Sequence, residues 1–234
     1  MPDDPLNPFI HPTFIQRFNR AVNLVNEGNA EAALKQYQHV FDPLEESQTQ
    51  NAFKGFVTGK FLATVELRKA YCLMDLGRYT EARAIFEQLD EGFASQLDSE
   101  GLYSFYFSYG NTLGNLGFIE EMDRRLSRAM DLAAETLKDT EKCESVWYWR
   151  LHWGKQHKAW QYLEAQCVAA NMFGVANNNM HMQILALEFR CYVHREWNRI
   201  EQARQGATGI LQWKKLAQAN PDIIREWEAF LESL

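Results

Sequence analysis

The chain has 234 residues, of which 46% are hydrophobic and 24% are charged, and its formal net charge is −7. These fractions are typical of a globular protein. An acidic chain lacks the general attraction to phosphate on which nucleic-acid binding depends, so we expect no DNA or RNA partner. The 13 glycines and 6 prolines are few for this length, which disfavours a fold of many short strands and favours long helices.

The first residues, MPDDPLNPF, are acidic and rich in proline, and they lack the basic start and apolar run of a secretory signal. No stretch approaches the roughly 18 uncharged apolar residues of a membrane span, so we expect no membrane partner. Cys72, Cys143, Cys167 and Cys191 lie far apart with no CxxC pair. This spacing fits buried thiols in a reducing compartment. We therefore expect a cytoplasmic protein.

The N-terminal part of the chain predicts a helix, a tight turn and a second helix. Residues 1–12 are expected to form an extended arm, and Thr13 with Gln16 resembles a capping box. Apolar residues then recur at helical spacing, are interrupted at Gly28, and resume over residues 30–41.

The same arrangement returns along the chain. The turns fall at Gly28, Gly77 and Gly117, and further turns are predicted near His157 and Asn198, at intervals of 49, 40, 40 and 41 residues. A recurring period between about 20 and 50 residues is typical of stacked repeats. Each hairpin leaves an apolar face that only a neighbour can cover. The longer first interval predicts an insertion, whose conformation over residues 43–60 the sequence leaves open.

Small residues stand where two helices of a hairpin must come close. Ala21, Ala70 and Gly110 each lie seven residues before a turn glycine. The turn glycines themselves suit the left-handed backbone that ends a helix. Ala33 and Ala82 lie five residues after a turn, where the third hairpin has a methionine instead.

This pattern resembles the tetratricopeptide repeat. The matching residues of the second unit are Ala70, Leu73, Gly77-Arg78-Tyr79, Ala82 and Phe86, and those of the third are Gly110, Leu113, Gly117-Phe118-Ile119, Leu126 and Ala129. The motif covers residues 14–130, and residues 141–217 continue it by spacing. The interval near 40 exceeds the family's usual period of about 34 and implies longer helices. The resemblance implies an all-α fold, an α-α superhelix of about five hairpins over residues 13–219.

A final helix is predicted over residues 220–234, with Asn220 as N-cap and Pro221 in the first helical position. Its apolar stripe comprises Ile223, Ile224, Trp227, Phe230, Leu231 and Leu234. One interpretation is a capping helix that covers the last hairpin. The other is a docking helix, through which the chain forms a homodimer.

The motifs of catalysis are mostly missing: the sequence has no GxSxG, HExxH, GxGxxG or DDxxD. Residues 55–60 approach a phosphate-binding loop, but only three residues separate its glycines and Phe61 stands where a Ser or Thr must bind the metal. Among the histidines only His39 has a carboxylate, Asp42, three or four residues away, and such a pair is usually a surface contact. We expect no enzyme, metal or cofactor.

Two clusters have alternative interpretations. Met172, Met180, His181 and Met182 surround residues 177–179, three asparagines. Thioethers and imidazole can hold Cu(I), but we favour a helix–helix turn at the asparagines with methionines filling the core.

The second cluster is aromatic and crowds the fourth hairpin: Trp147, Tyr148, Trp149, Trp153, Trp160 and Tyr162. We favour packing between hairpins, with anchoring of a bound chain as the alternative.

In tetratricopeptide proteins the first helix of each hairpin lines a concave groove that holds a peptide or a partner helix. By position, the resemblance implies the groove residues Thr64, Tyr71, Asp75, Phe107, Asn111, Asn115, Glu144, Trp147, Lys155, Glu188, Tyr192 and Arg195. The amide of Asn111 suits a hydrogen bond to a peptide backbone. Leu67 and Phe107 occupy places where the clamp for a chaperone's terminal carboxylate needs lysine. The set suits a partner with apolar anchors and some basic character.

The leading hypothesis is a non-catalytic scaffold or adaptor that binds a protein or peptide. The second is a ligand- or peptide-sensing regulator that acts through a partner protein, because the chain has no helix-turn-helix with a basic face. The third is an all-α enzyme or metal carrier built on the fourth hairpin or on the Met/His turn.

Overall fold

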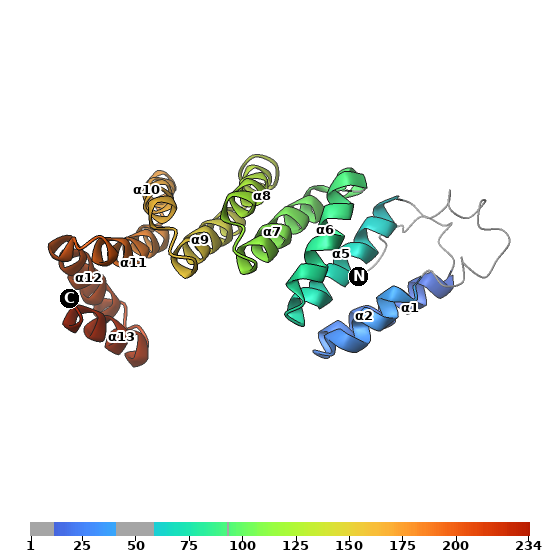
Figure 1. Cartoon of the computed structure of the whole chain (residues 1–234), viewed down its shortest axis with the longest axis horizontal. Coiled ribbons are helices and arrows are strands. Elements are labelled where there is room, and N and C mark those ends of the chain that lie inside the picture. The colour runs from blue at the N-terminus through green and yellow to red at the C-terminus, as the bar shows by residue number, and fades with distance from the viewer. Residues whose placement is uncertain (1–11, 41–58, 93) are drawn as a thin grey trace. The chain divides into compact units, whose positions relative to one another are not determined.

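In the computed structural model the described residues are 12–40, 59–92 and 94–234. They contain eleven α-helices and no strand, which confirms the all-α prediction for this part of the chain (Figure 1). The predicted arm, apart from Pro12, lies outside the described residues, as do Asp42 and all but the last two residues of the predicted insertion, 43–60. Within the described residues, no helix is both long and apolar enough to cross a bilayer.

The helices form two compact units that meet in sequence between Lys138 and Asp139. The predicted repeat domain, residues 13–219, runs through both units.

The first unit contains six helices: α1 (Pro12–Asn26), α2 (Ala30–Gln38), α5 (Gly59–Asp75), α6 (Tyr79–Gly92), α7 (Ser99–Asn115) and α8 (Ile119–Asp131). A short 3-10 turn (η1, Ala94–Gln96) precedes α7, and a π-helical turn (η2, Leu132–Leu137) follows α8. Helix α1 packs on α2, α5 on α6 and α7 on α8, and contacts between α2 and α5 and between α6 and α7 join successive hairpins. Helix α1 begins at Pro12, one residue before the predicted cap at Thr13, because proline suits the first helical position.

The glycine turns lie where the sequence predicts them. Gly28, Gly77 and Gly117 have φ angles of +76°, +71° and +83°, a backbone region that side chains with a Cβ rarely adopt. Gly110 of α7 is a close approach within its hairpin, because a Cβ built there would lie 2.7 Å from Leu126 Cδ2 of α8. The preference for a small residue seven positions before the turn glycine therefore has a steric cause in this hairpin.

The second unit contains α9 (Thr140–Gln156), α10 (Trp160–Ala176), α11 (Met180–Glu196), α12 (Ile200–Leu216) and α13 (Pro221–Glu232). Helix α9 packs on α10 and α11 on α12, and α10 also contacts α11. The turns predicted near His157 and at Asn198 are confirmed, with Lys158 and Asn198 at φ angles of +54° and +55°. These turns use left-handed residues other than glycine, which explains why their sequence signal is weaker.

Helix α13 begins as predicted, with the Asn220 side chain accepting a hydrogen bond from the Asp222 backbone N–H and Pro221 in the first turn. Trp227 and Phe230 are buried in a cluster with Cys191 of α11 and with α12. Figure 1 shows α12 and α13 side by side at the C-terminal end. The large residues of the stripe therefore cover the last hairpin, as expected of a capping helix.

The four cysteines are free and buried, as predicted. Burial raises the pKa of the Cys72 thiol to about 11 and that of Cys191 to about 12. The thiols are therefore held in the protonated, unreactive form.

Candidate functional site

Two adjoining cavities lie beside α5 in the first unit. One, of about 320 Å³, is lined by Val25, Arg68, Tyr71, Cys72, Met74, Asp75 and Ser108. The other, of about 400 Å³, is lined by Val25, Gly28, Asn29, Ala30, Glu31, Asp75 and Leu76. Val25 and Asp75 border both. The structure thus places two of the residues expected in the groove, Tyr71 and Asp75, at one hollow surface formed by the first helices of three hairpins.

Two side chains of opposite charge, Arg68 and Asp75, line the first cavity. Arg68 and Asp75 are seven residues apart on α5, about two helical turns or about 10 Å, and no ion pair among the described residues includes either. Asp75 is the last residue of α5, where the helix dipole disfavours a carboxylate. A cation from outside the chain would therefore stabilise the unpaired carboxylate of Asp75.

Between these charges the surface is aromatic and apolar. Tyr71 is half-buried, and burial raises the pKa of its phenol, while the Ser108 hydroxyl and the charge of Arg68 oppose that rise. The phenol therefore stays neutral, and because its hydroxyl oxygen is buried, it offers the cavity a ring face rather than a charge.

The other expected residues of the first unit serve packing. The Thr64 hydroxyl donates to the Lys60 carbonyl at 2.8 Å within α5. Phe107 stacks on Tyr103, with ring centres 5.5 Å apart. Asn115 Nδ2 donates to the Asn111 backbone carbonyl at 3.0 Å, and the Asn111 side chain is only 6% exposed. Asn111 is therefore largely withdrawn from solvent, and its hydrogen bond to a ligand backbone stays a prediction.

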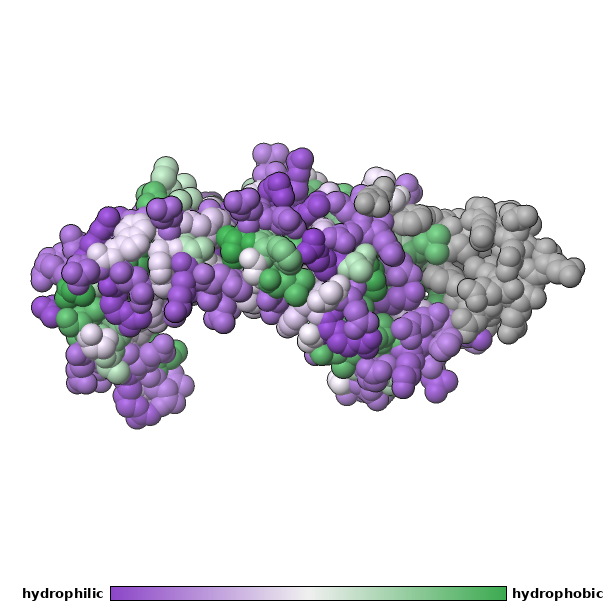
Figure 2. All heavy atoms as spheres, in the orientation of Figure 1, coloured by the Kyte–Doolittle hydropathy of each residue, from purple (hydrophilic) through white to green (hydrophobic). Residues whose placement is uncertain are grey.

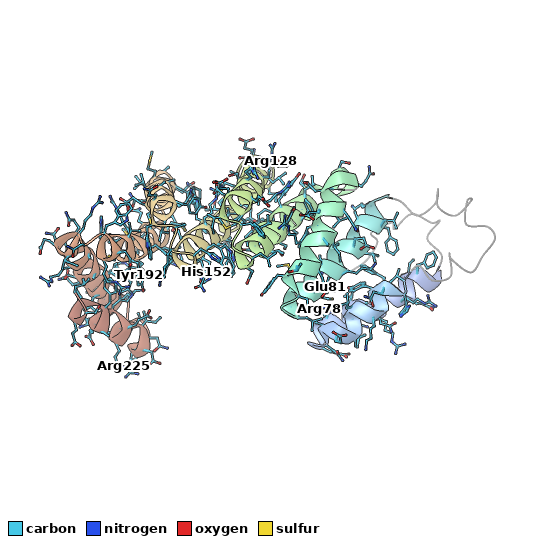
Figure 3. All side chains as sticks on the ribbon, in the orientation of Figure 1. Arg78, Glu81, Arg128, His152, Tyr192 and Arg225 are labelled. Atoms are coloured by element: carbon cyan, nitrogen blue, oxygen red, sulfur yellow. The ribbon has the colours of Figure 1, made fainter. Side chains whose placement is uncertain are left out.

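In the second unit, four expected residues come together. The Lys155 ammonium nitrogen of α9 lies 3.4 Å from the centre of the Tyr192 ring of α11. The Arg195 guanidinium lies 5.7 Å from the same ring and 5.1 Å from that of Phe230 on α13. Glu188 pairs with Lys214 at 2.6 Å. Figure 3 shows Tyr192 on α11, the helix that carries three of these residues.

The surroundings of the Lys155 ammonium disfavour its charge. Burial is the main cause that lowers the pKa of Lys155, Arg195 adds to it, and Glu226 and Glu188 oppose it. Lys155 has no ion-pair partner of its own among the described residues and faces aromatic rings instead. The cluster thus sets the cations of Lys155 and Arg195 against aromatic rings, beside the carboxylates of Glu188 and Glu196. Tyr192 is held against Trp227 and Phe230.

Glu144 and Trp147 do not join that cluster. Glu144 Oε1 accepts a hydrogen bond from Asn179 Nδ2 at 2.5 Å, which ties α9 to the start of α11. Trp147 is 9% exposed and contacts the Phe173 ring of α10. Both side chains therefore join helices within the unit, and a role for either in binding a partner stays a prediction.

The remaining clusters divide between packing and exposure. Trp153 is buried and stacks on Trp149 with ring centres 5.3 Å apart, whereas Tyr148 is exposed. The asparagine run forms the expected turn, with Asn178 at a φ angle of +51°. Of the methionines around it, only Met182 is buried, so the core-filling interpretation is wrong for Met172 and Met180. The described residues hold no group of three or more His, Cys, Asp or Glu placed for a metal ion.

Sequence reasoning missed two sets of residues. Arg68 and Ser108 line the first cavity, and each lies three residues before an expected groove residue, so helical spacing could have found them.

A polar cavity of about 520 Å³ between α6, α7 and α8 was also missed; it is lined by Glu87, Asp90, Tyr109, Glu121, Arg124, Arg125 and Arg128. Two of its lining residues, Arg125 and Asp90, form an ion pair at 2.7 Å, and Glu121 pairs with Arg83 at 3.6 Å. The sequence feature that could have indicated this cavity is the group of arginines on α8, Arg124, Arg125 and Arg128.

Comparison with known proteins gives no match, either to a family model or to a curated protein. The function is therefore argued from the fold and from these surfaces.

Proposed function

We propose that this protein is a non-catalytic scaffold or adaptor that binds a segment of another protein on the surface formed by the first helices of its hairpins. The observation that carries the proposal is the pair of adjoining cavities beside α5, bordered by Arg68, Tyr71 and Asp75. Two unpaired opposite charges with an aromatic ring between them suit a peptide that carries a charged and an apolar side chain.

A superhelix similar to the tetratricopeptide repeat is part of the proposal. Three features support it: hairpins that contact their neighbours in sequence within each unit, left-handed turns at a recurring interval, and the close approach at Gly110. In such a stack each first helix faces the same side, so successive hairpins extend one binding surface.

The acidic end of the surface indicates the chemistry of the partner. Asp75 and Glu31 both line the second cavity, and the Glu31 carboxylate lies 3.9 Å from Arg78 while Asp75 has no such neighbour among the described residues. Arg78 is itself held by Glu81 at 2.6 Å (Figure 3). A Lys or Arg side chain of the partner would therefore bind at Asp75, and an apolar side chain would lie against Tyr71 and Met74.

The test is selection of peptides from a random display library on the purified full chain, followed by measurement of Kd by fluorescence anisotropy. We expect enriched peptides that combine Lys or Arg with apolar residues. Asp75→Lys is expected to weaken their binding at least tenfold, about 1.4 kcal/mol, because it reverses the charge that holds the partner's cation.

Asp131→Lys is the matched control. Asp131 is exposed in α8 as Asp75 is in α5, and it is not among the lining residues of either cavity, so its substitution makes the same change in net charge away from the proposed binding surface. A library that yields no binder, or two variants that weaken binding equally, would contradict the proposal.

The 320 Å³ cavity also supports a second function, that of a regulator that senses a small ligand or short peptide and acts through a partner. This volume lies at the lower end of the roughly 300–1,000 Å³ of small-ligand sites. A small molecule that raises Tm for the wild type and not for Asp75→Lys would favour this function. For either function we propose action in the cytoplasm, without a cofactor.

A further inference from the structure

The polar cavity of about 520 Å³ between α6, α7 and α8 is lined mainly by charged side chains. None of its lining residues borders the two cavities beside α5. Figure 2 shows hydrophilic, purple atoms over α8. The cavity is therefore a polar surface separate from the one proposed to bind a protein partner. Its charged residues are the arginines Arg124, Arg125 and Arg128 and the carboxylates Glu87, Asp90 and Glu121.

Each carboxylate of the cavity already has an arginine. Asp90 pairs with Arg125 at 2.7 Å. Arg83 of α6, which is not among the lining residues, pairs with Glu87 at 2.8 Å and with Glu121 at 3.6 Å. Two arginines thus balance the three carboxylates, and the other two arginines of the cavity are left without an acid.

Those two arginines, Arg124 and Arg128, are exposed. In the described part of the chain no ion pair or side-chain hydrogen bond includes either. They are four residues apart on α8, so they share one face of the helix with Cβ atoms about 5–6 Å apart, and like charges at this spacing destabilise a helix. Figure 3 shows Arg128 on α8. An anion held by both guanidinium groups would remove that repulsion.

The surroundings leave room for more than a bare ion. The volume of about 520 Å³ lies within the roughly 300–1,000 Å³ of small-ligand sites. A further hollow of about 240 Å³ adjoins it, because Arg124 and Glu121 border both, and the Phe118 side chain lines this second hollow. The Phe118 ring is 41% exposed. The organic part of an anionic ligand could therefore lie beside the charge that the arginines bind.

The number of free cations indicates which anion fits. A guanidinium group donates two parallel hydrogen bonds to the oxygens of a carboxylate or a phosphate. A phosphate monoester carries a charge of about −1.5 to −2 at neutral pH and three acceptor oxygens, so one such group can accept from both arginines and balance both charges. A carboxylate or a phosphodiester carries a single charge and would leave one arginine unbalanced.

We propose that Arg124 and Arg128 form a binding site for a phosphate monoester at the cavity between α6, α7 and α8. The group could be carried by a phosphorylated side chain of another protein or by a small organic phosphate, because the same two arginines would bind the same group in either case. The site goes beyond the proposed protein-binding surface and shares no lining residue with it.

The test is isothermal titration calorimetry of the full chain with three probes at the same ionic strength. The first is a peptide of about ten Gly and Ala residues with one phosphoserine, the second is the same peptide with glutamate in that place, and the third is glycerol 3-phosphate. We expect both phosphorylated probes to bind, and the glutamate peptide to bind at least tenfold more weakly. Tighter binding of the phosphoserine peptide would assign the source to a protein, and tighter binding of glycerol 3-phosphate would assign it to a small molecule.

Substitutions test the two arginines. Arg124→Gln and Arg128→Gln should each raise the Kd of the phosphorylated probes at least tenfold, because each removes one of the two cations. Arg128→Lys keeps the charge but loses the paired donors, so its Kd should lie between those of the wild type and Arg128→Gln. Arg204→Gln is the matched control, since Arg204 is also exposed and belongs to α12 of the second unit.

Far-UV circular dichroism checks that the variants keep the wild-type helix content, as expected for exposed side chains. Three results would overturn the proposal. They are the absence of binding of both phosphorylated probes at millimolar concentration, equal affinity for the phosphoserine and glutamate peptides, and an Arg204→Gln variant that loses as much affinity as Arg128→Gln.

Discussion

The Lys155 ammonium lies 3.4 Å from the centre of the Tyr192 ring, and this contact joins the first helices of the two hairpins in the second unit. Tyr192 in turn contacts the Phe230 ring of α13, with ring centres 5.2 Å apart. One aromatic side chain therefore links α9, α11 and α13. Its contribution combines ring packing with attraction to a cation that has lost part of its hydration.

Replacing that ring should weaken the second unit. We expect Tyr192→Leu to lower the free energy of unfolding by about 1–2 kcal/mol, because the cation–π contact and two ring contacts are lost. Tyr192→Phe keeps the ring and should cost less than about 0.5 kcal/mol. Urea denaturation followed by tryptophan fluorescence measures both, and equal losses in the two variants would show that the hydroxyl, not the ring, matters.

Gly110 should not tolerate a methyl group. Gly110→Ala places a Cβ 2.7 Å from Leu126 Cδ2, so we expect a loss of about 1–3 kcal/mol through overpacking. Gly209→Ala is the control, because a Cβ there meets nothing within 4 Å and alanine favours the helix by about 0.5–1 kcal/mol. Thermal unfolding should show a lower Tm for the first variant and an equal or higher Tm for the second. An unchanged Tm for Gly110→Ala would mean that the Leu126 side chain can move to make room for the methyl group.

The left-handed turn residues of the second unit should accept glycine. Lys158 and Asn198 hold φ angles of +54° and +55°, which cost a residue with a Cβ roughly 1 kcal/mol. Lys158→Gly should therefore raise the urea midpoint slightly, whereas Gly77→Ala in the first unit should lower it. A fall in the midpoint for Lys158→Gly would indicate that its side chain contributes more than its backbone costs.

Acid should destabilise the second unit through its histidines. Burial is the main cause that lowers the pKa of His152 and of His194, and Lys155 and His157 add to the effect at His152. Below about pH 6.5 the unfolded chain binds protons at these imidazoles that the folded chain does not bind, so stability present above that pH is lost as pH falls.

We expect Tm to fall by a few degrees from about pH 7 to about pH 5. His152→Phe keeps a ring beside Trp149 and Trp153 and removes one titrating group, so its Tm should fall less over the same range. An equally steep fall in this variant would assign the acid sensitivity to other groups.

Much of the fold could be predicted from local pattern. The five turns followed from glycines and spacing, and α13 followed from Asn220 and Pro221, because turn and cap conformations depend on residues close together in the chain. The groove residues could be placed only by position within a repeat. Tyr71 and Asp75 do border a cavity, but Asn111 and Trp147 are buried, since whether a helix position faces a neighbour depends on how hairpins pack.

The sequence by itself determined that this chain forms paired helices, where they turn, and that its thiols are buried, because those properties depend on hydrophobic periodicity and on residues within one turn of each other. Only the tertiary structure decided which side chains share a surface: Arg68 with Asp75 at one cavity, Lys155 with Tyr192, and Arg125 with Asp90 at another cavity. Burial and charge pairing depend on helices distant in sequence, and no local pattern specifies them.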